Sequence, residues 1–288
     1  MQVDRQPRAL RVLDDSQQEK VLADALSTVT MSEKDTTPAV NRLPPKVFAR
    51  ILAFRTLERT LVTATHVCRH WRSAILSVPT LWTNIPCRDL DRTLTYLERS
   101  KDALIDVHAT SPSSSFPMCD ILSRHIERTR LLRANLSRAD VRSAVLQLRD
   151  PVLSLEILEL FGSTFDAPRI NLPADFLGRH TPSLFSIHFS DVSPTFTPFY
   201  LPNLTHFYLR GTDEPTPMDS IFALFKNAPR LREVFIFCRH TTPGTILFHE
   251  ITLDFLEILT LRIYDPVPIL RFLCLPSIKQ GLAPGSRM

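Results

Sequence analysis

Five segments in the second half of the chain share one apolar pattern, and this repetition limits which folds are possible. Each segment has apolar residues at positions i, i+3 and i+5, and successive segments begin 20 to 29 residues apart, at Leu155, Leu184, Leu204, Leu231 and Leu256. A weaker copy begins at Leu131, and Leu275 is a candidate start of another. Stretches with helical spacing lie between some of them, such as ADVRSAVLQL before Pro151 and MDSIFALFKN before Pro229.

A short strand, a turn and a helix in units of this length predict a leucine-rich-repeat-like solenoid, because one unit cannot bury its apolar face without a stacked neighbour. An ordinary α/β domain with a parallel sheet is the alternative. In a solenoid, the side chains between the repeat leucines alternate onto the concave face. We expect this face to bind a partner, and it would display Glu159, Phe161, His188, Tyr208, Arg210, Phe235, Phe237, Thr260 and Arg262. In the alternative fold, Phe161, Phe235 and Phe237 pack inside the core.

The region before the repeats has a helical pattern. Val47, Ile51 and Phe54 lie at i, i+4 and i+7, after a double proline, Pro44 and Pro45, that suits a helix entrance. A second stretch, up to Pro79, places six residues on one helical face: Leu61, Ala64, Val67, Cys68, Trp71 and Ile75. We expect two or three short helices that need outside support. Residues 1–39 are predicted to be an amphipathic helix, within 10–30, followed by a polar linker.

Residues 65–85, THVCRHWRSAILSVPTLWTNI, contain both tryptophans of the chain together with His66, His70 and Cys68. Two histidines four residues apart on a helix could bind one metal ion, but no HExxH glutamate and no further ligand cluster accompany them. We therefore interpret the segment as a packed helix that faces a partner, because tryptophan often anchors interfaces. No metal and no cofactor are expected.

The rest of the sequence has no pattern typical of an enzyme. No GxxxxGK[ST], GxGxxG or GxSxG occurs among only six glycines, and His249-Glu250 lacks a second histidine. The net charge of +4 is scattered, so we expect no nucleic-acid partner. The five cysteines form no CxxC, and no apolar stretch approaches the ~20 residues of a membrane span. We expect a cytoplasmic or nuclear protein that is not an enzyme.

The stretch from residue 40 to 86 resembles the F-box family. The matching residues are Asn41-Arg-Leu-Pro-Pro, Phe48, Ile51-Leu52, Val67-Cys-Arg-His-Trp71-Arg and Leu81-Trp82. Together with the repeats, the chain is similar to the F-box and leucine-rich-repeat proteins common in mushroom-forming fungi. The resemblance implies an α+β chain with a small all-helical F-box at 40–86 and an α/β leucine-rich-repeat-like solenoid at 87–288. We expect this solenoid to be a shortened form of a longer relative, since it ends without an evident final repeat.

The resemblance also implies a function. In that family the F-box docks onto a Skp-type adaptor, and through it onto a cullin, as the substrate receptor of an SCF-type ubiquitin ligase. Carried over by position, the adaptor-binding residues would be Leu43, Pro44, Val47, Phe48, Ile51, Leu52, Val67, Cys68, Trp71, Leu81 and Trp82. The protein substrate would contact the repeat face at Glu159, His188, Tyr208, Arg210, Phe235 and Arg262. The alternative is a non-catalytic repeat scaffold that acts independently of ubiquitin ligation. The chain departs from the family at Lys46, where an acidic residue is usual.

Overall fold

The structure is a computed structural model that describes residues 42–55, 58–110, 118–162, 170–173, 175–179, 181–193, 200–211, 215–244 and 250–277. The chain divides into two compact units, Met1–Val78 and Pro79–Met288. The first unit is helical where it is described, and every strand that the structure describes lies in the second. The predicted mixture of helix and strand is therefore confirmed, whereas the predicted helix and linker of residues 1–39 lie outside the described residues. None of the described helices has the length and apolar character needed to span a membrane.

The described part of the first unit contains three short helices, α2 (Pro45–Arg55), α3 (Glu58–Ala64) and α4 (Arg69–Leu76), of which α2 and α3 both contact α4. Apolar side chains from all three helices are buried between them: Phe48, Leu52, Leu61, Ala64 and Ile75. The rings of Phe48 and Trp71 pack edge to face, with their centroids 4.7 Å apart. Burial of each of the four larger side chains contributes about 1.5–3 kcal/mol, so this set makes only a small core.

The stretch that the sequence predicts as one helical face is divided between α3 and α4. α3 ends at Ala64, because the backbone N–H groups of His66 and Val67 donate three residues back, to Thr63 and Ala64, in place of the four-residue spacing of an α-helix. The side-chain hydroxyl of Thr65 also donates to the carbonyl of Val62 in this turn. Val67 then lies in a turn with 58% of its surface exposed, and Cys68 is extended. His66 lies in this turn and His70 in α4, so the two residues lack the helical i, i+4 geometry that a shared metal would need.

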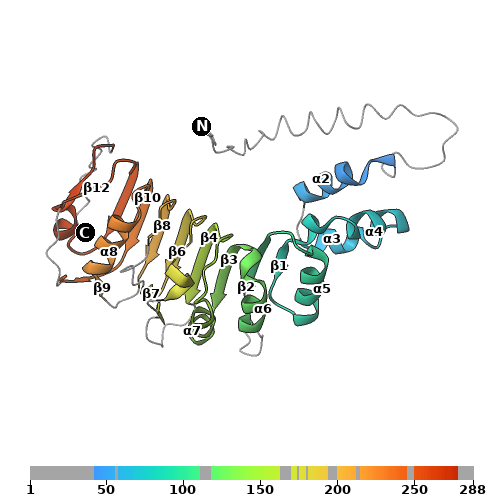
Figure 1. Ribbon diagram of the computed structural model, residues 1–288, viewed down its shortest axis with the longest axis horizontal. Coiled ribbons are helices and arrows are strands. Elements are labelled where there is room, and N and C mark those ends of the chain that lie inside the picture. The colour runs from blue at the N-terminus through green and yellow to red at the C-terminus, as the bar shows by residue number, and fades with distance from the viewer. Residues whose placement is uncertain are drawn as a thin grey trace. The chain divides into compact units, whose positions relative to one another are not determined.

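The second unit is built on one eight-stranded sheet whose strand order follows the chain, with every strand parallel to its neighbours (Figure 1). The strands are β1 (Asn84–Pro86), β2 (Ile105–Thr110), β3 (Thr129–Leu136), β4 (Ile157–Gly162), β6 (Ser186–Ser190), β8 (His206–Arg210), β10 (Glu233–Phe237) and β13 (Ile258–Arg262). The two units divide after Val78, whereas the F-box predicted from the sequence ends at residue 86. Residues 84–86 belong to the second unit because they form β1, which pairs with β2.

Each of the five repeated segments contains a strand of this sheet, and the weaker copy at Leu131 lies within β3. The first leucine of each segment precedes its strand and is at most 1% exposed. The sequence analysis did not identify β1 or β2 as strands. Residues 275–277 lie outside any helix or strand, and the rest of the candidate repeat at Leu275 lies outside the described residues.

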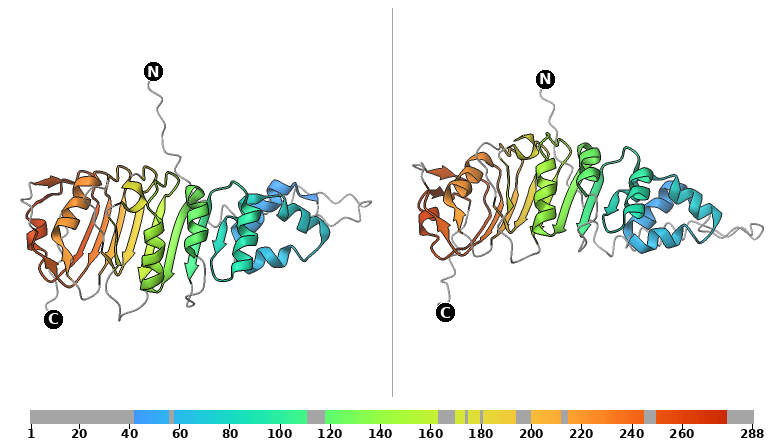
Figure 2. Two further views of the ribbon diagram at one scale, coloured as in Figure 1. Left: turned by 60° about the horizontal axis from the view of Figure 1, so that its bottom comes forward. Right: turned by 90° about the horizontal axis from the view of Figure 1, so that it is seen from below.

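Four helices lie along one side of the sheet (Figures 1 and 2). They are α5 (Leu90–Ser100), α6 (Met118–His125), α7 (Arg138–Gln147) and α8 (Met218–Asn227). Shorter elements complete the connections: η2 (Pro79–Trp82), η3 (Ile126–Arg128), η4 (Phe176–Arg179) and α9 (Val267–Leu270). Three small parallel pairs join β5 (Ile170–Asn171) to β7 (Val192–Ser193), β9 (Thr216–Pro217) to β11 (Thr241–Thr242), and β12 (Ile251–Thr252) to β14 (Leu273–Cys274).

The core of this unit lies on the buried face of the sheet. Strand positions alternate between buried and partly exposed, as expected for a period of two. One row of register partners crosses five strands with at most 2% exposure, and consists of Leu132, Leu158, Ile187, Phe207 and Val234. The opposite face of each strand therefore carries the side chains available for other purposes.

Candidate protein-binding surfaces

The start of α2 is the first predicted surface. Pro44 is exposed, and its carbonyl accepts hydrogen bonds from the backbone N–H groups of Val47 and Phe48 at 2.9 and 3.0 Å. The double proline therefore begins the helix, as predicted. Leu43 is half-buried and Val47 is 38% exposed, so both have apolar surface that a partner could cover.

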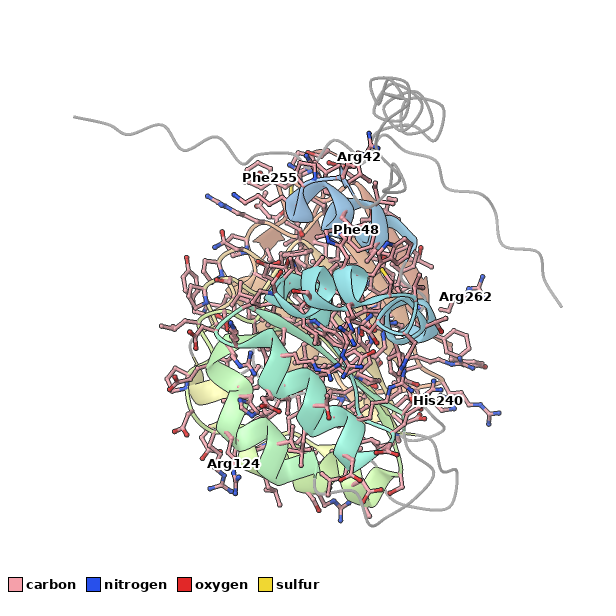
Figure 3. The ribbon with its side chains drawn as sticks, turned by 90° about the vertical axis from the view of Figure 1, so that its right-hand side faces the viewer. Arg42, Phe48, Arg124, His240, Phe255 and Arg262 are labelled. Atoms are coloured by element: carbon pink, nitrogen blue, oxygen red, sulfur yellow. The ribbon has the colours of Figure 1, made fainter. Side chains whose placement is uncertain are left out.

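Two of the predicted contact residues on α2 are in fact core residues. Phe48 is 4% exposed and Leu52 is 8% exposed, whereas Ile51 is half-buried. Phe48 lies on α2 as Figure 3 shows, and its ring packs against Trp71, which is half-buried. Phe48 and Leu52 thus support the surface of the unit from inside, and Trp71 is the large aromatic ring that stays accessible.

Cys68 caps α4. Its backbone is extended, and its sulfur accepts a hydrogen bond from the backbone N–H of Trp71 at 3.5 Å, which satisfies one of the free donors at the start of the helix. Cys68 therefore has a structural role at the start of α4, and its contact role stays a prediction, as does that of Val67, which is exposed. His66 and His70 are exposed too, and the described residues contain no group of three or more metal-ligating side chains.

Leu81 and Trp82 cannot act as predicted. They lie in η2, in the second unit, and are 8% and 0% exposed. The ring of Trp82 meets Tyr96 edge to face at 5.0 Å, and the guanidinium of Arg99 lies 4.3 Å from its centroid, a cation–π distance. Both residues belong to the core beneath α5, which leaves almost no surface for an adaptor.

The second surface is the exposed face of the sheet, and all nine residues predicted to share a face do so. Strand register aligns Glu159, His188, Tyr208, Phe235 and Thr260 in one row. A neighbouring row contains Phe161, Ser190, Arg210, Phe237 and Arg262. Phe161 and Phe235 are half-buried and Phe237 is 47% exposed, so the alternative in which these rings fill a core is wrong.

Four rings on this face form a continuous series across β4, β6, β8 and β10. Phe161 contacts His188 at 4.7 Å, His188 contacts Tyr208 at 5.5 Å, and Tyr208 stacks on Phe235 at 4.7 Å with the planes only 6° apart. Burial lowers the pKa of His188, and the positive charges of Arg133 and Arg210 lower it further against the opposing effect of Glu159. His188 therefore contributes a neutral ring at neutral pH.

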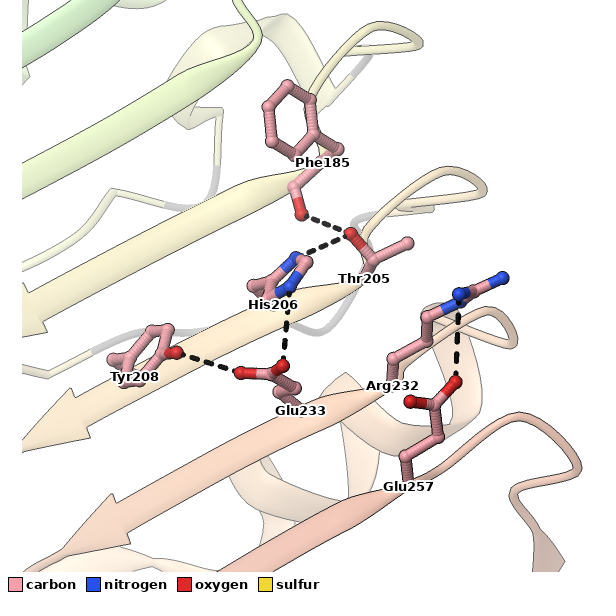
Figure 4. Close-up of polar contacts among 7 residues, drawn as sticks. All are labelled: Phe185, Thr205, His206, Tyr208, Arg232, Glu233 and Glu257. Carbon is pink, nitrogen blue, oxygen red and sulfur yellow. Dashed lines mark hydrogen bonds and ion pairs between the residues drawn. The ribbon is translucent and has the colours of Figure 1, made fainter. Parts of the chain in front are cut away.

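A polar network that the sequence analysis missed holds this series in place (Figure 4). The hydroxyl of Tyr208 donates to Glu233 at 3.0 Å, and the other carboxylate oxygen of Glu233 lies 3.8 Å from Nε2 of His206. Thr205 contacts Nδ1 of His206 at 2.8 Å and donates to the carbonyl of Phe185. Burial and the bond to Glu233 both raise the pKa of Tyr208. From the sequence, the only signal that predicts His206 and Glu233 on this face is the alternation of side chains along β8 and β10.

The cations of the face differ between its two ends. On β2 to β4, Nε and Nη2 of Arg130 donate to the two carboxylate oxygens of Asp106, at 3.0 and 2.6 Å, and Arg133 is paired with Glu159. On β8 and β13, Arg210 and Arg262 are exposed. Figure 3 shows Arg262 and His240 projecting on one side of the second unit and Arg124 of α6 on the other.

Comparison with known families adds one match. The model of the F-box-like family matches residues 40–88. The chain contains an F-box-like domain. This domain includes all of α2, α3 and α4, and its last residues, 79–88, fold with the second unit. No curated protein matches the chain.

Proposed function

We propose that this chain is the substrate receptor of an SCF-type ubiquitin ligase. Its F-box-like domain would bind a Skp-type adaptor, and through it a cullin, while the exposed face of the sheet would bind the protein to be modified. The observation that carries the proposal is the F-box-like domain itself, since F-box domains typically bind Skp-type adaptors. This role needs no catalytic residue or cofactor in this chain. We propose that the protein acts in the cytoplasm or the nucleus.

We also infer that the second unit is a leucine-rich-repeat-like solenoid. Support comes from the strand order, which follows the chain, and from the buried leucine before each of the five repeated strands. The four helices on one side of the sheet support it too, because an ordinary parallel sheet has helices on both faces. Such a unit leaves one sheet face open for a partner.

The adaptor surface that we propose is smaller than the family pattern implies. It consists of residues with accessible apolar area, and these are Leu43, Pro44, Val47, Ile51, Val67 and Trp71. Phe48, Leu52 and Cys68 would act indirectly, by holding the helices together. The ligase would then speed ubiquitin transfer by raising the effective concentration of target lysines near the charged partner enzyme.

Capture by an immobilised Skp-type adaptor tests this proposal. We expect the double variant Leu43→Ala/Trp71→Ala to lose capture, because it removes two apolar contacts. Leu94→Ala/Tyr200→Ala is the matched control, since Leu94 and Tyr200 are exposed residues of the same kinds in the second unit, and it should be captured normally. Because Trp71 also packs on Phe48, Val47→Glu supplies an independent variant at an exposed position, and it too should abolish capture. Normal capture of both Trp71 and Val47 variants would refute the adaptor assignment.

A further inference from the structure

At the β2–β4 end of the exposed face, the strand arginines are paired with carboxylates. Arg130 and Arg133 each have a carboxylate partner on a neighbouring strand, and in both pairs the partner is less exposed than the arginine. Exposed ion pairs of this kind contribute little to stability, about 0–1 kcal/mol, but they leave the local surface without net charge. The β2–β4 end therefore has no unpaired cation at these positions to attract an anion.

The other end has a different arrangement. Arg210, Phe237 and Arg262 are register partners on β8, β10 and β13, so the phenylalanine lies between the two arginines. Both arginines are exposed, Phe237 is 47% exposed, and no described carboxylate forms an ion pair with either arginine. Asp265 follows β13, but its carboxylate accepts the backbone N–H of Val267 at the start of α9.

Aromatic surface continues from this row in two directions. The stacked rings of Tyr208 and Phe235 lie in the adjacent row. Tyr264, which is 86% exposed, lies 5.7 Å from the ring of His240, beyond the ends of β13 and β10. Arginine beside exposed aromatic rings is typical of the residues that dominate binding energy at protein interfaces.

We propose that Arg210, Phe237 and Arg262, together with the Tyr208–Phe235 stack, bind an acidic segment of the target protein that contains an apolar side chain between two carboxylates. This rests on the proposed function and assigns the chemistry of its substrate. Neighbouring strands lie about 4.8 Å apart, so the two arginine backbones are about 10 Å apart. An extended peptide advances about 3.3 Å per residue and turns every second side chain to the same side, so carboxylates at positions i and i+4, about 13 Å apart along the backbone, face the arginines together with the side chain at i+2. The long arginine side chains can spread over the remaining ~3 Å. Each guanidinium can bind a carboxylate through two parallel hydrogen bonds, and the apolar residue at i+2 would lie on Phe237.

A nucleic acid is the other polyanion that arginines and aromatic rings attract, and the surroundings disfavour it. A phosphate backbone needs a continuous track of cations. Here the same face carries Glu233 on β10, the strand between the two arginines, and Glu159 on β4, and only two of its strand cations lack an ion-pair partner among the described residues. A short segment with two isolated negative charges fits this pattern better than a repeating one.

Fluorescence anisotropy with the full chain tests the proposal directly. The probes are labelled peptides with the cores Glu-Thr-Leu-Thr-Glu and Gln-Thr-Leu-Thr-Gln, a version of the first with phosphoserine in place of each glutamate, and a single-stranded oligonucleotide of similar length. We expect the Glu-Thr-Leu-Thr-Glu peptide to bind at least ~10-fold more tightly than the Gln version, and its binding to weaken as the salt concentration is raised. Arg210→Glu/Arg262→Glu should reduce this binding at least ~10-fold.

Arg88→Glu is the matched control. Arg88 is exposed and donates to Thr110 of β2, at the opposite end of the same face, so its reversal should leave binding unchanged. Equal binding of the two peptides, no effect of the double reversal, or tighter binding of the phosphoserine peptide or the oligonucleotide would overturn the proposal. No adaptor is present in this measurement. Peptide binding without adaptor capture would therefore refute only the ligase role, and capture without this peptide preference would refute only the assigned substrate chemistry.

Discussion

Trp71 and Trp82 are close in sequence but belong to units with different physical tasks. Trp71 is half-buried in the first unit, where it covers Phe48. Trp82 is fully buried in the second unit, between Tyr96 and Arg99. The same side chain thus leaves apolar area for a partner in one unit and fills the core in the other. The difference shows that a family pattern read from sequence combines residues that bind with residues that only support the fold.

Stability is where we expect the largest contrast between the two tryptophans. Trp82→Ala should destabilise the second unit by about 3–5 kcal/mol, because it removes a large buried ring and leaves a cavity. Trp71→Ala should leave the unfolding of the second unit unchanged. Urea unfolding followed by far-UV circular dichroism, which the larger unit dominates, measures this effect. Leu94→Ala, an exposed change on α5, is the control and should be near neutral. Equal shifts for both tryptophan variants would contradict the contrast.

Cys68 and Cys87 offer a second comparison between the two units, in which we expect a difference in thiol reactivity. Burial raises the pKa of Cys87 to about 12, so the reactive thiolate is scarce near neutral pH. Cys87 is also fully buried, next to β1 in the second unit, whereas Cys68 in the first unit is half-buried. With iodoacetamide at pH 8, we expect Cys68 to be alkylated at least ~100-fold faster than Cys87, as measured by peptide mass mapping. In denaturant, the two should react at similar rates. Comparable rates in the folded protein would show that Cys87 is not enclosed.

The repeated strands could be predicted because their signal is local. Apolar residues two positions apart mark the buried face, and a fixed leucine precedes each strand, so β4, β6, β8, β10 and β13 were all found. The stretch LIDVHA fits the same spacing, with Leu104, Val107 and Ala109 at i, i+3 and i+5, but Leu104 is 47% exposed, unlike the buried leucines that precede the other strands. Neither β2 nor β1 beside it is among the predicted strands. The nine residues of the exposed face followed from the same period of two.

Two features could not be predicted, because they depend on contacts that the apolar pattern does not report. The apolar spacing continues through the turn that divides α3 from α4, whereas the break is seen in the backbone hydrogen bonds of His66 and Val67, which reach back three residues and not four. Similarly, the sequence shows that Trp82 is apolar, but it does not show whether the residue packs against a partner protein or inside its own chain. The pairing of Arg133 with Glu159 and the stacking of Tyr208 on Phe235 require the order of the strands in the sheet.

Co-expression of the full chain with a Skp-type adaptor, followed by size-exclusion chromatography with light scattering, tests the central claim most directly. We predict a single peak with the mass of a one-to-one complex, and loss of that peak for Val47→Glu. A chain that is soluble and elutes separately from the adaptor would contradict the account. In that case Lys46, which is exposed on α2 where the family usually has an acidic residue, would be the first position to revert.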